Sequence, residues 1–165
     1  MVEFVIYPDA RLSVPAPTRP VDALMLTAGE TLRSAAQEVQ AHGLAAAHLG
    51  LSEPLVVVSV AGQTAKRDYR ILFNPEVVLV GPESVIGAEG SVSLPGIEVP
   101  IDRPIWAEIA YDTPDGTQET ARFEDFVARV ALHEIDQMNG VFFLSRLSRI
   151  KRDTAIRKFE KSLRR

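Results

Sequence analysis

Leu132-His133-Glu134-Ile135-Asp136-Gln137-Met138-Asn139-Gly140 ends a strongly apolar segment that begins near Phe123. His133 and Gln137 are four residues apart, so on a helix they share one face. A second His in place of Gln137 would complete the pattern His-Glu-x-x-His, in which two imidazoles hold a metal and the Glu acts as a general base. The chain keeps the first His and the Glu of that pattern, and Gln137 replaces the second His.

The segment Phe123–Asn139 is predicted to be a buried central helix. Its apolar residues cover more than one stripe, with Phe126 and Val130 on one side and Leu132 and Ile135 on another. A helix that is apolar nearly all round is enclosed by the rest of its domain. The polar His133, Glu134 and Gln137 would therefore lie in the interior.

Composition restricts the class of protein. The 165 residues, 46% hydrophobic and 24% charged, fit one globular domain. No apolar run approaches the roughly 18 residues that span a bilayer, and Met1–Asp9 lacks the features of a signal peptide, so we expect no membrane partner and a cytoplasmic location. The absence of cysteine excludes disulfides, thiolate catalysis and every Cys-based metal site.

Local patterns predict an α+β domain. A capping box at Thr27–Glu30 would open a helix running from Ala28 to His42, with Gly43 as its stop and His42 capping its last carbonyls. Small residues from Gly43 to Gly50 indicate a close backbone approach. Strands are expected at Leu55–Val60, Lys66–Phe73, Glu76–Val80 and Ile105–Tyr111. A short strand or turn is expected at Val141–Leu147.

Charge is concentrated at the C-terminus. Residues 145–165 hold nine basic and two acidic residues, a net charge of +7, whereas residues 1–144 have a net charge of −11. This basic C-terminal helix is either a solvated surface helix or a site for a polyanion such as RNA.

Three stretches resemble, in order and separation, the motifs of the peptide deformylase family. The family patterns Gly-x-Gly-x-Ala-Ala-x-Gln, Glu-Gly-Cys-x-Ser and His-Glu-x-x-His correspond to Ala41–His48, Glu89–Ser93 and His133–Gln137. Supporting similarities occur at Tyr7–Leu12, Phe73–Pro75, Arg103–Pro104 and Asn139–Phe143. The resemblance covers the whole chain. It implies a single domain, residues 1–165, with antiparallel or mixed sheets around a buried central helix and with a C-terminal helix.

The resemblance also implies roles for individual positions. In the family the Cys of the second motif and both His of the third hold the metal; these positions are Ser91, His133 and Gln137 here. The Glu, here Glu134, moves the proton of the metal-bound water. The motif-one Gln and the backbone N–H after the Cys stabilise the oxyanion; they correspond to His48 and Val92. Pocket positions carried over in the same way are Gly43, Glu89, Gly90 and Arg103, and Glu89 and Arg103 are expected to form a structural pair that braces the site.

Two of the three metal ligands are replaced by poor ones. A serine hydroxyl is neutral at physiological pH, and a glutamine amide oxygen is a hard, neutral donor. We therefore expect the family's usual metal-dependent removal of formyl groups from N-formylmethionyl peptides to be lost or strongly impaired. No cofactor is expected, and any metal would be Fe or Zn at His133. Whether the chain is an enzyme stays open at this point.

Other functions are compatible with the same residues. A metal relocated to His48 and His133, aided by Glu134, would give a hydrolase of altered mechanism. Ser91 with a nearby His base, oriented by Glu89 or Glu134, would give a metal-free one. A third reading is a translation-associated protein that binds an N-terminal peptide in the pocket and contacts the ribosome through the basic C-terminal helix.

Overall fold

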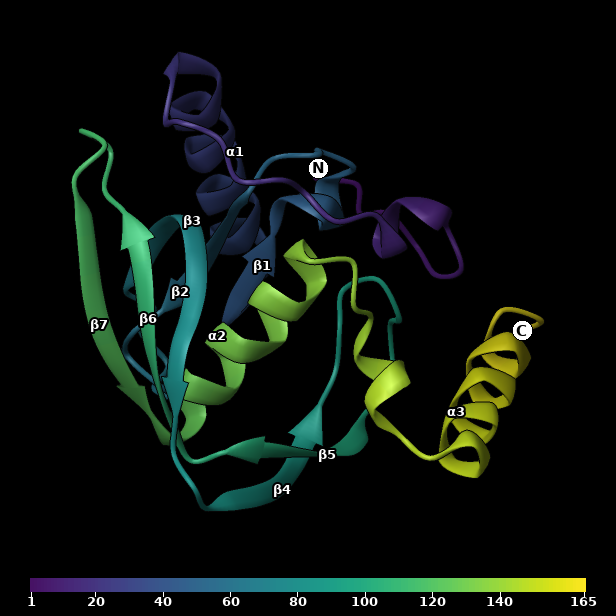
Figure 1. Ribbon diagram of the computed structural model, residues 1–165. Coiled ribbons are helices and arrows are strands. Elements are labelled where there is room, and N and C mark those ends of the chain that lie inside the picture. Colours follow the sequence, from purple (N-terminus) through teal and green to yellow (C-terminus); the bar gives the residue numbers. More distant parts are fainter.

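A five-stranded antiparallel sheet and a two-stranded sheet enclose one central helix in the computed structural model, which describes residues 1–165 (Figure 1). The larger sheet has the order β1-β2-β3-β6-β7, and β4 pairs with β5. The strands are β1 (Gly43–Ala45), β2 (Leu55–Ser59), β3 (Tyr69–Val80), β4 (Ser84–Glu89), β5 (Val99–Pro104), β6 (Trp106–Asp112) and β7 (Gln118–Glu124). The helices are α1 (Ala23–Val39), α2 (Asp125–Met138) and α3 (Arg149–Ser162), with 3-10 turns at Ala10–Ser13, Ala46–Leu49 and Phe143–Arg146.

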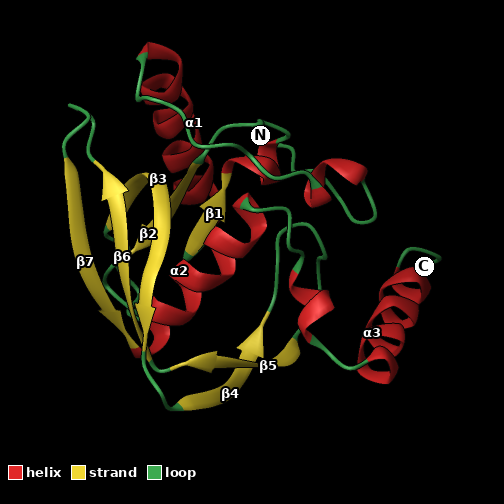
Figure 2. Cartoon of the chain, in the orientation of Figure 1, coloured by secondary structure: helices red, strands yellow, loops and turns green.

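The α2 helix is the predicted buried central helix. Ten of its 14 residues are buried, including His133, Glu134 and Gln137, and the helix lies between the five-stranded sheet and the β4–β5 pair (Figure 2). It starts at Asp125 and not at Phe123, because Phe123 and Glu124 still pair with β6 as the end of β7. The apolar pattern locates the helix correctly, and strand pairing determines where it begins.

The α1 helix starts earlier and ends earlier than predicted. Its N-cap is Asp22, whose carboxylate accepts the Met25 N–H at 2.9 Å, so the predicted cap at Thr27 was wrong. The helix stops at Gln40, which adopts φ 55° and returns its N–H to the carbonyls of Ala36 and Gln37. Gly43 instead opens β1, and His42 is not a helix cap. Aspartate as N-cap and a left-handed residue after the last turn are both common solutions for the unpaired groups at helix ends.

The β3 strand is continuous where two strands were predicted. Asn74 takes the left-handed conformation (φ 47°), and the register against β6 shifts between Phe73 and Glu76. Proline has no N–H to donate, so Pro75 occurs at this irregularity without ending the strand. The Asn74 side chain donates to the Arg19 carbonyl at 2.7 Å and to Asp112 at 2.9 Å, which stabilises the bend.

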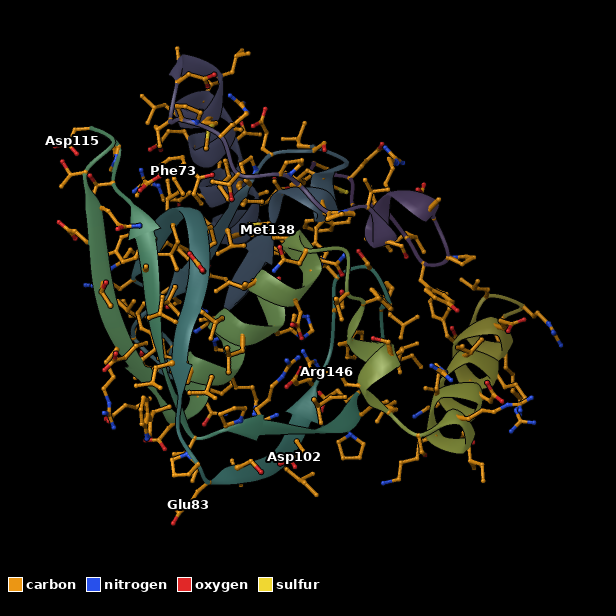
Figure 3. The ribbon with its side chains drawn as sticks, viewed as in Figure 1. Phe73, Glu83, Asp102, Asp115, Met138 and Arg146 are labelled. Atoms are coloured by element: carbon orange, nitrogen blue, oxygen red, sulfur yellow. The ribbon has the colours of Figure 1, made fainter.

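Apolar clusters lie on both faces of the larger sheet. On one face α2 packs against β2, β3 and β6. On the other, α1 packs against Phe73, which Figure 3 labels beside that helix. The β3–β4 and β6–β7 turns, marked by Glu83 and Asp115 in Figure 3, lie at opposite ends of the molecule.

The C-terminal helix is attached by an apolar face. Ser148 caps α3, and Ala155 and Phe159 are buried in a cluster with Leu12 and Phe142. The predicted short strand or turn before it is a 3-10 turn at Phe143–Arg146. The helices of the structure include none that is both long enough and apolar enough to cross a membrane.

Candidate functional site

A cavity of about 460 Å³ opens beside α2. Its wall brings together predicted site residues from three distant parts of the chain: Gly43, His48, Glu89, Gly90, Ser91, Val92, His133 and Glu134. The close backbone approach predicted at Gly43 is confirmed, since a Cβ there would lie 2.6 Å from Val130 Cγ1 of α2. Two predicted residues, Gln137 and Arg103, do not line the cavity.

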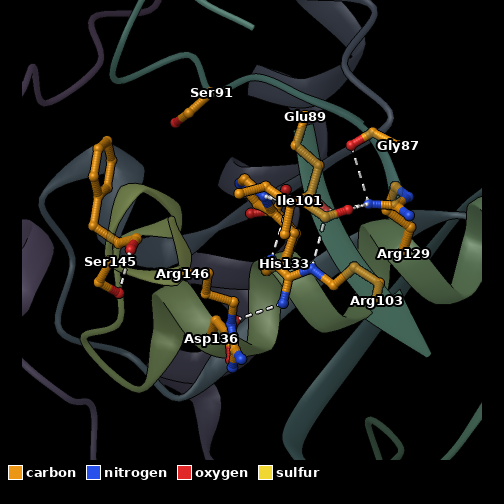
Figure 4. A network of polar contacts seen from close by, with 12 residues as sticks. Gly87, Glu89, Ser91, Ile101, Arg103, Arg129, His133, Asp136, Ser145 and Arg146 are labelled. Carbon is orange, nitrogen blue, oxygen red and sulfur yellow. Dashed lines mark hydrogen bonds and ion pairs between the residues drawn. The ribbon is translucent and has the colours of Figure 1, made fainter. Parts of the chain in front are cut away.

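Glu89 is the centre of a buried ionic network (Figure 4). Its carboxylate accepts two hydrogen bonds from Arg103, each 2.9 Å long, one from Arg129 Nη1 at 2.7 Å, and it lies 2.8 Å from His133 Nδ1. Burial alone would raise the pKa of Glu89, but the hydrogen bonds from His133 and Arg103 outweigh it and hold the pKa at about 2. The predicted Glu89–Arg103 pair is confirmed as a part of this larger network.

Arg129 is a member of the network that sequence reasoning missed. It is buried and follows Phe126 by three residues on α2. Its position inside an otherwise apolar stretch was the available signal, because a buried arginine almost always has a partner. Arg103 extends the network to the surface through Asp136, which also accepts from Arg146 (Figure 4).

His48 is uncharged and donates to Ser91. The Ala45 N–H points at His48 Nδ1 at 3.0 Å, so the proton of the neutral ring is on Nε2, which lies 3.5 Å from Ser91 Oγ. Burial lowers the pKa of His48 to about 3. Ser91 Oγ in turn accepts the Ser93 N–H at 3.0 Å. In this arrangement His48 has no free lone pair with which to take the proton of Ser91.

His133 presents only one ring nitrogen to the cavity. Its Nδ1 is engaged by Glu89, and its ring packs against Phe143 with centroids 5.2 Å apart. Burial would lower the pKa of His133, but the charges of Glu134 and Glu89 and the hydrogen bond to Glu89 raise it. His133 is therefore a cation paired with a carboxylate over a wider pH range than a free histidine.

Glu134 is buried with little compensation. Its Oε1 has no hydrogen-bond partner, and burial raises its pKa to about 7. His48 Nδ1 lies 3.7 Å away, but the neutral ring makes no ion pair with it. A carboxyl group in such surroundings holds its proton close to neutral pH.

Replacing Glu134 by Gln is expected to change how stability depends on pH. The folded-state pKa of Glu134 is about 7, above the ordinary 4.5. Its contribution to the free energy of unfolding is therefore fully present below pH 4.5 and is lost as the pH rises through 7. When the pH is raised from 5 to 8, the free energy of unfolding of Glu134→Gln should therefore rise by about 2–3 kcal/mol relative to that of the unmodified chain. Urea unfolding of both proteins at the two pH values measures this, and parallel pH dependences would contradict it.

Gln137 holds the N-terminal segment instead of facing the cavity. Its side-chain N–H donates to the Leu12 carbonyl at 2.6 Å. His42, expected at the end of a helix, lines the cavity with its ring edge-on to Phe126 at 4.7 Å between centroids. Both positions are determined by contacts between segments far apart in sequence.

This architecture and this site define a deformylase-type fold, and the comparisons agree with it. The chain belongs to the polypeptide deformylase family, whose sequence profile matches residues 1–153. It is similar to a protein of Bradyrhizobium diazoefficiens described as peptide deformylase-like, with 38% identity over 164 residues, 95% of this chain and 91% of the relative. A peptide deformylase of Agrobacterium fabrum is 32% identical over 144 residues, 87% of this chain and 85% of the relative.

Solved structures of peptide deformylases are also similar to this chain. The crystal structure of peptide deformylase from Ehrlichia chaffeensis superposes with a TM-score of 0.89 at 30% identity, covering 99% of this chain and 97% of the other. The predicted family and the predicted α+β fold with its central helix are thus confirmed.

The side chains present do not fit the metal of the family. Ser91 and Gln137 are neutral donors, and the hydrogen bonds they make to Ser93 and Leu12 already engage them. His133 remains as the only strong ligand of the three. No group of three or more His, Asp or Glu side chains in the structure is arranged to hold a metal ion.

Proposed function

We propose that this chain binds the N-terminal part of a short peptide in its cavity and does not perform the usual metal-dependent deformylation of its family. The observation that carries the proposal is a cavity of about 460 Å³ whose wall keeps the family's motif positions while Gln137 is engaged by Leu12. The geometry needed for a ligand persists, and the chemistry needed for the metal does not.

The side chains at the metal-ligand positions support the proposed absence of metal-dependent deformylation. A catalytic metal of this kind requires three good protein ligands and one open position. Loss of a residue that merely orients a ligand typically reduces metal affinity by about 10–100-fold. Replacing two direct ligands by neutral oxygens should reduce the affinity much further.

The two enzymatic alternatives find less support. For a metal between His48 and His133, only the Nε2 atoms are available, because Ala45 and Glu89 engage the Nδ1 atoms. Two imidazoles make a sparse site. For a serine nucleophile, His48 would have to accept the Ser91 proton, and its tautomer donates instead. Binding without these reactions is therefore the function that the geometry favours.

A combined metal and turnover measurement tests the proposal. The untagged protein, loaded with Fe or Zn and dialysed, is expected to hold only traces of metal and to show no chelator-sensitive release of formate from formyl-Met-Ala-Ser. Calorimetry with the same peptide is expected to show binding. The Ehrlichia enzyme, whose structure has been determined in complex with actinonin, serves as the positive control for turnover. Stoichiometric metal together with turnover that a chelator abolishes would contradict the proposal.

A contact with RNA through α3, in the cytoplasm, is a second proposal. Its support is the arrangement of the helix: Ala155 and Phe159 are buried, while Lys151, Lys158 and Lys161 are exposed. Basic side chains held on one solvent-facing surface are suited to phosphate groups.

Charge reversal tests this contact without removing the buried Phe159. Lys158→Glu/Lys161→Glu is expected to abolish salt-sensitive co-sedimentation with ribosomes. Each lost lysine reduces the number of counterions that binding releases from the RNA, and each new glutamate repels the RNA phosphates. The matched control is Lys66→Glu/Arg70→Glu, two exposed cations outside α3, which should sediment like the unmodified chain. Absence of co-sedimentation for the intact protein at low salt would end the idea.

A further inference from the structure

We propose that the cavity selects a peptide whose first residue is aromatic, and that His42 and Phe126 form the corner that holds its ring. The inference rests on the proposed function and specifies its ligand. In this aromatic corner the two rings meet edge to face, at an angle of 76° and with centroids 4.7 Å apart. Both side chains line the cavity and are only partly buried, so each has ring surface left to meet a ligand.

The other apolar side chains of the wall have less surface to offer. Leu44 and Val130 line the cavity but are only 1% and 8% exposed, because they belong to the core. Ala41, Ala88 and Val92 are less buried but small. Phe126 is therefore the one large apolar side chain of the wall that the fold leaves partly uncovered.

The nitrogens of His42 face the protein and not the cavity. Its Nδ1 is buried without a hydrogen-bond partner, and its Nε2 lies 3.5 Å from Nη2 of Arg67. Burial and the charge of Arg67 lower the pKa of His42, so the ring is neutral at physiological pH. The part of His42 that a ligand can reach is consequently the carbon surface of an uncharged aromatic ring.

His42 is held in this orientation from two sides. Its carbonyl accepts the Ser59 N–H at 2.7 Å, which fixes its backbone beside β2. Arg67, in the connection between β2 and β3, is itself fixed because its Nε and Nη2 donate to the Gln40 carbonyl at 3.1 and 3.0 Å. A ligand ring therefore meets an ordered corner, and binding costs little additional side-chain entropy.

The charged side chains of the wall do not call for a charged ligand. Arg129 donates to Glu89 at 2.7 Å and to the carbonyls of Ile101 and Val85 at 2.8 and 2.7 Å (Figure 4). Glu89 is also paired with Arg103. Since these charges compensate one another within the chain, an uncharged first side chain leaves none of them without a partner.

The geometry of the corner favours an aromatic ring over a saturated one. Aromatic pairs prefer edge-to-face or offset-stacked arrangements and gain stabilisation beyond the area that they bury. Because the two rings of the corner are nearly perpendicular, a ligand ring can stack on one of them and meet the other edge-on. A saturated ring of the same size buries a similar area but lacks the π-system that stabilises both contacts.

Calorimetry on the full-length protein with three N-formyl peptides tests the inference. The peptides formyl-Phe-Ala-Ser, formyl-cyclohexylalanine-Ala-Ser and formyl-Met-Ala-Ser differ only in the first side chain. Phenylalanine and cyclohexylalanine have similar sizes, and only phenylalanine is aromatic. The Phe peptide is expected to bind at least about 5-fold more tightly than the cyclohexylalanine peptide, and also more tightly than the Met peptide.

Variants locate the preference. Phe126→Leu and His42→Leu should each remove most of the preference for Phe over cyclohexylalanine. His42→Phe keeps an aromatic ring without the two nitrogens, so it should retain the preference. The matched control is Phe4→Leu, which removes a partly buried ring packed against the cluster beneath α1 and should leave the preference unchanged. The two variants at position 42 decide the question if Phe126→Leu fails to fold.

Each outcome is decisive. Equal binding of the Phe and cyclohexylalanine peptides, or tightest binding of the Met peptide, would overturn the aromatic preference and leave the proposed peptide binding intact. A preference that His42→Leu keeps, or that His42→Phe loses, would overturn the role of the His42 ring. If none of the three peptides bound, the proposed function would fall together with this inference.

Discussion

The triple variant His48→Gln/Ser91→Cys/Gln137→His is expected to bind about one divalent transition-metal ion per chain, while the unmodified chain retains traces. The three changes restore the ligand set and the oxyanion donor that the family carries at these positions. His133 already has its Nδ1 fixed by Glu89 at 2.8 Å, and a ligand imidazole oriented in this way is ready to bind through Nε2. The change at position 137 removes the hydrogen bond to Leu12, at a cost of about 1 kcal/mol.

Metal analysis after dialysis, together with thermal unfolding, measures the outcome. A bound metal should raise the midpoint of unfolding, and a chelator should reverse the rise. The matched control adds His133→Ala to the triple variant, which should lose the metal again. A triple variant that folds like the unmodified chain and stays free of metal would show that positions 91, 133 and 137 do not converge on one metal centre.

Replacing Glu89 by Ala is expected to lower the free energy of unfolding by about 3–5 kcal/mol. The change leaves Arg103, Arg129 and His133 buried in the same region without their common anion. Buried cations without a partner are strongly destabilising, because the desolvation penalty is no longer compensated. Glu89→Gln should cost less, since it keeps the shape and can still accept hydrogen bonds.

The control uses an exposed ion pair of similar type. Glu30 pairs with Arg33 on the surface of α1, with side chains 64% and 41% exposed, and Glu30→Ala should change stability by less than about 1 kcal/mol. Chemical unfolding of the three variants beside the unmodified chain gives the comparison. Equal effects of Glu89→Ala and Glu30→Ala would show that the buried network contributes no more than a surface pair.

The sequence predicted the elements whose signals are local. The all-round apolar pattern located α2, and the β-branched run Leu55–Val60 located β2. It missed β4 and β7 because most of their residues are exposed, and β5 because two prolines and the buried Arg103 obscure its alternation of buried and exposed residues. Such strands form because a neighbouring strand satisfies their backbone groups, and a single segment carries little trace of its partner.

Some features of the site were likewise predictable from the sequence, and others were not. His133 and Glu134 were identified from the spacing of the His-Glu pattern, and Ser91, His48 and the Glu89–Arg103 pair through the resemblance to the family's motifs. The weakness of Ser91 and Gln137 as metal ligands followed from the chemistry of their side chains. What only the tertiary structure decided is what each of these side chains does: Gln137 binds the Leu12 carbonyl, His48 donates toward Ser91, and Arg129 joins Glu89 in the wall. The reason is physical. A buried polar group takes the partner that the packed fold brings within hydrogen-bond distance, and those partners are separated by 40 to 125 residues along the chain.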